Sequence, residues 1–149
     1  MAFLLKQDAV TVTSETMNKS EILEYLIHLV SSVYNLPYYN EILNLIMARE
    51  DKLSTGIGLG IAVPHCLIDK TSQIVVGAML VLNGVEYNSV DGQPVKLIFL
   101  IISQVNDITG HIACLSSISR AVSDDMTRMK LLNSLTADEL YGTIKETIT

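Results

Sequence analysis

Histidine is scarce in this 149-residue sequence, and His65 has the most unusual surroundings of the three histidines. It ends the stretch S-T-G-I-G-L-G-I-A-V-P-H, which begins at Ser54. Pro64 has no N–H and fixes φ, so we expect a strand to stop there and to present the imidazole at the rim of a sheet. A neutral imidazole is a good nucleophile towards phosphorus. His65 is therefore the candidate nucleophile, and an ordinary surface histidine is the alternative.

His111 and Arg49 are the side chains that can complement such a nucleophile. His111 is expected at the start of a helix, where the helix dipole disfavours the imidazolium and favours a neutral tautomer with one donor nitrogen. Arg49 is expected in the last turn of an earlier helix, and its planar fork can hold phosphate oxygens. Together they would stabilise a transferring phosphoryl group without a metal. On the residues alone, a partly exposed His111 and a solvated Arg49 remain equally open interpretations.

Other kinds of site fit the sequence less well. Residues 56–60 read G-I-G-L-G inside a strand-like stretch, which is not the G-x-G-x-x-G of a dinucleotide site, and no Gly-Lys-Ser/Thr follows. No two histidines stand at metal-ligand spacing, and His28 is expected to be a boundary residue of a helix. Cys66 and Cys114 form no C-x-x-C and no disulfide framework, which favours a reduced cytoplasmic protein. We therefore expect neither cofactor nor metal.

Composition excludes further classes. The net charge is −6 and the basic residues are not clustered, so nucleic-acid binding is not expected. The longest apolar run, residues 95–102, is interrupted by Lys96 and is far shorter than the ~18 residues of a membrane span. The N-terminus lacks the basic region and cleavage pattern of a signal peptide. These features predict one cytoplasmic domain over residues 1–149.

Hydrophobic periodicity predicts the elements that position these residues. Helical spacing indicates two helices before the glycine-rich stretch, the first opened by an Asn18–Glu21 capping box, and further helices after residue 110, the last opened by Thr136 and Glu139. Alternating or continuous apolar runs indicate strands between them. The expected helices span about 19–35, 38–50, 111–122 and 124–133, with a terminal helix after Thr136 that includes Leu140 and Ile144. The expected strands span 57–63, 74–82, 85–88 and 95–102. This pattern predicts a layered α/β domain.

The stretch A-R-E-D-K-L-S-T-G-I-G-L-G-I-A-V-P-H resembles the active-site region of a bacterial family. The family is the type-2 enzyme IIA of the phosphoenolpyruvate-dependent sugar phosphotransferase system (PTS), the fructose/mannitol family, which also includes a nitrogen-regulatory branch. The likeness continues through residues 88–97 and the helix with His111 and Arg120, and it extends from about residue 5 to 148. Two positions depart from the family pattern. Leu59 stands where relatives are commonly polar, and Cys66 stands where small residues are frequent.

The resemblance implies a fold and a function. The fold would be a single mixed β-sheet of about five strands flanked by helices. His65 would receive a phosphoryl group from the phosphohistidine of the carrier HPr and pass it to a cysteine of enzyme IIB, while His111 and Arg49 contact that group without metal or nucleotide. A membrane component, IIC, would hold the sugar specificity. A nitrogen-related regulatory protein that signals through His65 is the alternative, and a non-catalytic binding module would require a His65 that cannot be phosphorylated.

Overall fold

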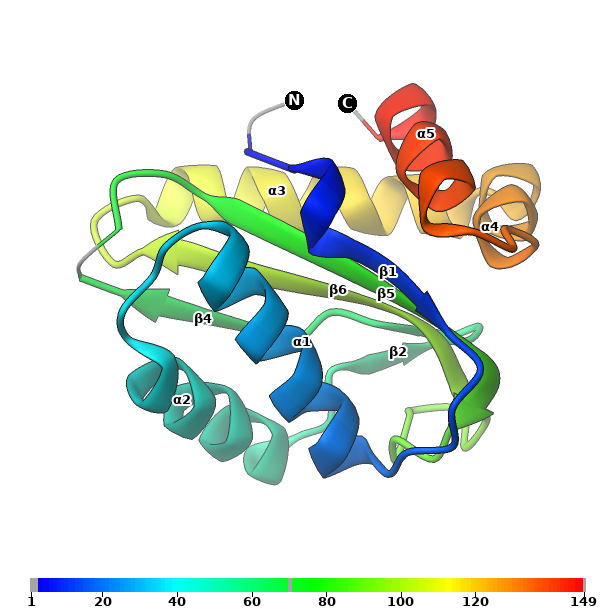
Figure 1. Ribbon diagram of the computed structural model, residues 1–149, viewed down its shortest axis with the longest axis horizontal. Helices are drawn as coiled ribbons and strands as arrows, with labels where there is room; N and C mark the ends of the chain where they lie inside the picture. The colour runs from blue at the N-terminus through cyan, green and yellow to red at the C-terminus, as the bar shows by residue number, and fades with distance from the viewer. Residues whose placement is uncertain (1–2, 70, 149) are drawn as a thin grey trace.

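The computed structural model describes residues 3–69 and 71–148, so positions 1–2, 70 and 149 of the expected domain lie outside it (Figure 1). Within the described residues, six strands form one mixed sheet with helices on both faces. The strands are β1 (Val10–Thr13), β2 (Gly56–Gly58), β3 (Ile61–Ala62), β4 (His65–Ile68), β5 (Val75–Val85) and β6 (Val95–Gln104). The helices are the 3-10 turn η1 (Gln7–Ala9), α1 (Lys19–Val33), α2 (Tyr39–Lys52), α3 (Ile108–Ser123), α4 (Asp125–Leu132) and α5 (Ala137–Thr147). The predicted α/β class is confirmed.

The long strand β6 lies at the centre of the sheet. It pairs antiparallel with β5 on one side and parallel with β3 and β4 on the other. The strand order is β1-β5-β6-β3-β2, with β4 also on β6. Helices α1 and α2 cover one face of the sheet, and α3 and α5 cover the other (Figure 1). Covering both faces explains why β5 and β6 are nearly continuous apolar runs.

Alternate residues of β6 serve two separate cores. Leu97, Phe99 and Ile101 pack in a cluster with residues of α3 and α5, whereas the residues between them pack in a cluster with α1 and α2. Cys114 belongs to the first cluster and Cys66 to the second, so the sheet lies between the two thiols. Burial raises the pKa of each thiol to about 12, which keeps both protonated and unreactive.

The glycine-rich stretch is a hairpin, and the predicted single strand over 57–63 is wrong. Strands β2 and β3 pair antiparallel around Leu59 and Gly60, whose φ values are 60° and 82°. Positive φ at both central residues turns the chain back on itself, which alternation of side chains cannot predict. The Leu59 N–H donates to Asp91 Oδ2 at 2.9 Å, and this bond holds a non-glycine residue in that conformation.

Pairing with β6 resumes directly after Pro64. The carbonyl of Pro64 accepts the Ile101 N–H at 3.0 Å, and β4 begins at His65 in register with Ile101. The strand is interrupted at Val63 and Pro64, but the prediction that pairing ends there is wrong. His65 is the first residue of a strand, not a residue beyond the end of one.

Several other boundaries differ from the sequence predictions. Strand β5 runs on to Val85, so no separate strand occupies residues 85–88. Helix α3 begins at Ile108 because Asp107 caps it. Strand β1 was not predicted, although its alternating valine and threonine residues are typical of a strand. The capping box at Asn18 is present in full. In the described part of the chain, no helix is long and apolar enough to span a membrane.

Candidate functional site

His65 and His111 meet on the α3 side of the sheet. Their ring centroids lie 5.3 Å apart and the ring planes are inclined by 54°. His65 is partly exposed at the start of β4, whereas His111 lies in the first turn of α3 and is 7% exposed. The turn after β6 reverses the chain and places α3 over the sheet, and this brings the two rings together. The sequence left open whether the two histidines converge, and in the structure they lie side by side.

A backbone hydrogen bond sets the tautomer of His65. Its Nδ1 lies 2.8 Å from the carbonyl oxygen of Val63. A carbonyl can only accept, so Nδ1 carries the proton and donates. In the neutral ring Nε2 then holds the lone pair. The nitrogen of His65 that can act as a nucleophile is therefore Nε2.

Hydrogen bonds also link the N–H of Val63 to a buried carboxylate. The Val63 N–H donates to the Thr55 carbonyl at 3.0 Å. The Thr55 N–H donates to Glu50 Oε1 at 3.1 Å, and the Thr55 hydroxyl bonds to the other carboxylate oxygen. Glu50 thus ties the end of α2 to the segment that orients His65.

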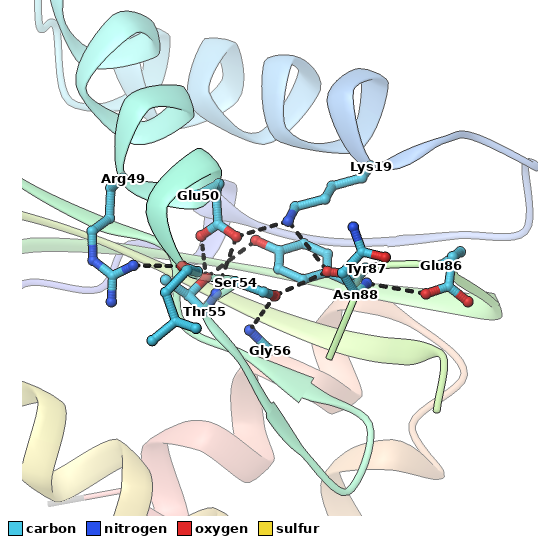
Figure 2. Close-up of polar contacts among 10 residues, drawn as sticks. Lys19, Arg49, Glu50, Ser54, Thr55, Gly56, Glu86, Tyr87 and Asn88 are labelled. Carbon is cyan, nitrogen blue, oxygen red and sulfur yellow. Dashed lines mark hydrogen bonds and ion pairs between the residues drawn. The ribbon is translucent and has the colours of Figure 1, made fainter. Parts of the chain in front are cut away.

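Figure 2 shows how the negative charge of the buried Glu50 is balanced. Lys19 Nζ lies 3.0 Å from Glu50 Oε1, and the two side chains are 21% and 3% exposed. Lys19 also donates to the Tyr87 carbonyl at 3.2 Å, and Ser54 Oγ donates to the same oxygen at 2.9 Å. Burial and the Glu50 carboxylate raise the pKa of Tyr87, so its phenol stays protonated. This buried polar cluster joins α1, α2 and the S-T-G segment.

Arg49 precedes Glu50 in the last turn of α2, as predicted. Its Nη1 donates to the carbonyl of Leu53 at 2.5 Å, where a cation suits the carbonyl end of a helix (Figure 2). The structure therefore brings the two histidines together, and it places the Arg49 guanidinium on the loop that leads to β2. Contact between Arg49 and a phosphoryl group stays a prediction.

His111 is held by a residue that the sequence analysis missed. Its Nδ1 lies 2.6 Å from Oγ of Ser103, a fully buried residue of β6. Burial lowers the pKa of His111, and the neighbouring His65 lowers it further, so the ring is neutral at neutral pH. The neutral form was expected from the helix dipole, and in the structure burial and His65 both favour it. Ser103 could have been recognised in the sequence as the polar residue that continues the alternating series Leu97, Phe99 and Ile101.

The glycines allow two loops to pack closely. A Cβ on Gly56 would lie 2.9 Å from Cα of Ser89, and the Gly58 N–H donates to Ser89 Oγ at 3.1 Å. The Val90 N–H donates to the Gly56 carbonyl at 3.1 Å. These backbone N–H and C=O groups are thus hydrogen-bonded within the protein. The closest approach is at Gly56, and its partner is the loop containing Ser89.

The third histidine, His28, has a structural role. His28 packs edge-on against Tyr39 with ring centroids 5.6 Å apart, as a boundary residue of α1. Among the described residues, no group of three or more histidines, cysteines or carboxylates is arranged to hold a metal ion.

Comparison with known families shows which family the chain belongs to. The sequence model of the family described as "Phosphoenolpyruvate-dependent sugar phosphotransferase system, EIIA 2" matches residues 3–147. The chain belongs to this EIIA family. The match covers both histidines, Arg49 and the buried cluster around Glu50.

EIIA relatives with different roles resemble the chain. The fructose-specific EIIA component of the PTS in Haloferax volcanii is 24% identical over 141 residues, which cover 95% of this chain and 92% of that protein. The crystal structure of the nitrogen regulatory protein IIA-Ntr from Neisseria meningitidis is 26% identical, with a TM-score of 0.84 over 94% of this chain and 95% of that one. The Escherichia coli complex of enzyme IIAMTL with phosphorylated IIBMTL shares the fold, at 17% identity and a TM-score of 0.75, over 96% and 99% of the chains.

Proposed function

We propose that this EIIA chain carries a phosphoryl group on Nε2 of His65, receives it from the phosphohistidine of HPr and passes it to a cysteine of an enzyme IIB in sugar uptake. The observation that supports this most directly is the hydrogen bond from His65 Nδ1 to the Val63 carbonyl. It leaves Nε2 as the free nitrogen of a partly exposed ring, next to a second histidine.

The first transfer step needs a neutral His65 and a phosphorylated donor. The lone pair of Nε2 forms a bond to phosphorus while the P–N bond of the donor phosphohistidine breaks, and the donor ring leaves with that electron pair. His65 keeps its Nδ1 proton, so its ring becomes positive. The Val63 carbonyl stabilises this charge because it already accepts from Nδ1.

The second step reverses the bonding at His65. A thiolate of enzyme IIB attacks phosphorus, the P–Nε2 bond breaks, and its electron pair returns to Nε2. His111, which is neutral in the unphosphorylated protein, donates to the phosphoryl oxygens in both steps. Arg49 would add a guanidinium once it moves from the Leu53 carbonyl to the bound group.

Exposed apolar side chains on α3 and on the β2–β3 hairpin suit transient docking of two successive partners. Ile108 and Ile112 lie within one turn of His111 and are 47% and 56% exposed. Ile57 and Leu59 on the hairpin are 42% and 59% exposed. Exposed apolar residues of this kind mark interaction surfaces. The IIAMTL–IIBMTL complex supports an enzyme IIB as one partner.

A regulatory role is the second candidate, and the likeness to IIA-Ntr favours it. In that case His65 would be phosphorylated by the same chemistry, but the phosphorylated protein would act as a signal. The two roles differ in whether His65 passes the phosphoryl group on to an enzyme IIB.

Labelled phosphoryl transfer tests the proposal and separates the two roles. Phosphorylated HPr should label the wild-type chain and a His28→Ala control, and it should leave His65→Ala unlabelled while that variant remains folded. Full labelling of His65→Ala would refute the assignment. Loss of label to a candidate IIB protein supports the relay. Stable label in the presence of every candidate IIB would favour the regulatory role.

A further inference from the structure

The α3-facing side of β6 changes from apolar to polar at its end. Leu97, Phe99 and Ile101 fill the core beneath α3, and the next residue on that face is Ser103, which is fully buried. Strand register places Ile101 beside His65 and Ser103 beside Leu67. A buried hydroxyl requires a hydrogen-bond partner, and Nδ1 of His111 lies 2.6 Å from it. Ser103 and His65 thus approach His111 from the same strand pair.

We propose that Ser103 is a positioning residue for phosphoryl transfer, in which its hydroxyl donates to Nδ1 of His111 and leaves the proton of that ring on Nε2. Its consequence for transfer rests on the proposed function. The Nε2–H is then the group of His111 that can donate to phosphoryl oxygens on His65. The opposite tautomer would turn a lone pair towards those oxygens and repel them.

A hydroxyl suits this position because it serves both charge states of the ring. When His111 is neutral, Ser103 donates to Nδ1. When a phosphoryl group on His65 draws a proton to His111, both ring nitrogens become donors, and Ser103 then accepts after rotation about one bond. The ring keeps its place in both states, which transfer requires because small misplacements slow it strongly.

The tautomer can be observed in the unphosphorylated full-length protein. Long-range 1H–15N correlation spectra of histidine-labelled wild type at neutral pH should show a protonated Nε2 and an acceptor Nδ1 for His111, with the signals assigned through His111→Gln. A proton on Nδ1 would overturn the proposal. No phosphoryl donor is involved, so failure of HPr to label the chain would count against the proposed function alone.

Three serine variants then test the link to transfer. Ser103→Ala should alter the ring-nitrogen pattern of His111 and slow transfer from HPr by about 10- to 100-fold. Ser103→Thr keeps the hydroxyl on a β-branched residue that a strand accepts, and it should retain the wild-type pattern. Ser31→Ala is the matched control, because Ser31 is a buried serine whose Oγ has no hydrogen-bond partner among the described residues.

The outcomes separate positioning from a general structural role. Ser103→Ala with unchanged His111 signals contradicts the proposal, whether transfer is slow or normal. Altered signals with wild-type transfer contradict it as well. If Ser103→Ala does not fold, the wild-type tautomer and the Ser103→Thr spectrum decide, since loss of the pattern in a folded threonine variant would also overturn it.

Discussion

The carbonyl oxygen of Val63 accepts a hydrogen bond from Nδ1 of His65 at 2.8 Å, across the intervening Pro64. The contact is local, but its geometry depends on distant groups. The Val63 N–H is held by Thr55, and Thr55 is held by Glu50. The orientation of the reactive ring is thus linked to a buried carboxylate at the end of α2.

We expect Arg49→Ala to slow transfer from HPr by about 10- to 1000-fold without unfolding the protein, because one charged donor to the phosphoryl oxygens is lost. Rapid-quench measurement of labelled transfer gives the rate. Lys52→Ala is the control, since Lys52 is an exposed cation in the same helical turn. Equal rates in wild type and Arg49→Ala would remove Arg49 from the site.

His111 should make folding stability depend on pH. Burial and His65 lower its pKa in the folded state below the ordinary value of 6.5. The unfolded chain therefore takes up this proton at higher pH, so stability declines as pH falls below about 6.5 and levels off below the folded pKa. His111→Gln should lose this part of the slope in urea unfolding between about pH 5 and 7. The same change at His28 should keep it, and an unaltered slope in His111→Gln contradicts the prediction.

Removal of the Glu50 carboxylate should destabilise the fold. Glu50→Ala leaves Lys19 unpaired and Thr55 without its acceptor, at a cost of roughly 2–4 kcal/mol in the free energy of unfolding. Glu146→Ala is the control, because its pair with Lys130 has side chains 65% and 54% exposed. Such a surface pair contributes at most about 1 kcal/mol. Urea titrations of both variants test the difference, and equal losses would contradict a special role of Glu50.

Two glycine-to-alanine changes should act in opposite directions. In Gly56→Ala the new Cβ would lie 2.9 Å from the backbone of Ser89, so separation of the two loops should cost about 1–3 kcal/mol. Gly142 lies within α5, and a Cβ there has nothing within 4 Å. Gly142→Ala should therefore stabilise by about 0.5–1 kcal/mol. Thermal unfolding of each variant gives the sign, and a stable Gly56→Ala would show that the loops can separate freely.

The sequence by itself determined the features that depend on neighbouring residues. Periodicity located both N-terminal helices and the long strands β5 and β6, because one buried face repeats along each element. The Asn18 cap and the Pro64–His65 pair could be recognised because each depends only on residues that are close together in the chain. The run around His65 also indicated the EIIA family, since it is long and continuous. Arg49 was correctly placed at the end of its helix.

Tertiary structure decided what depends on register and on approach between distant segments. The reversal at Leu59 is held by a hydrogen bond from its N–H to the Asp91 carboxylate, and the partner of Gly56 proved to be Ser89. The meeting of His65 with His111 followed from the parallel register of β4 on β6 and from the start of α3 at Ile108. Side-chain patterns record which face is buried, but they do not record which other segment covers that face.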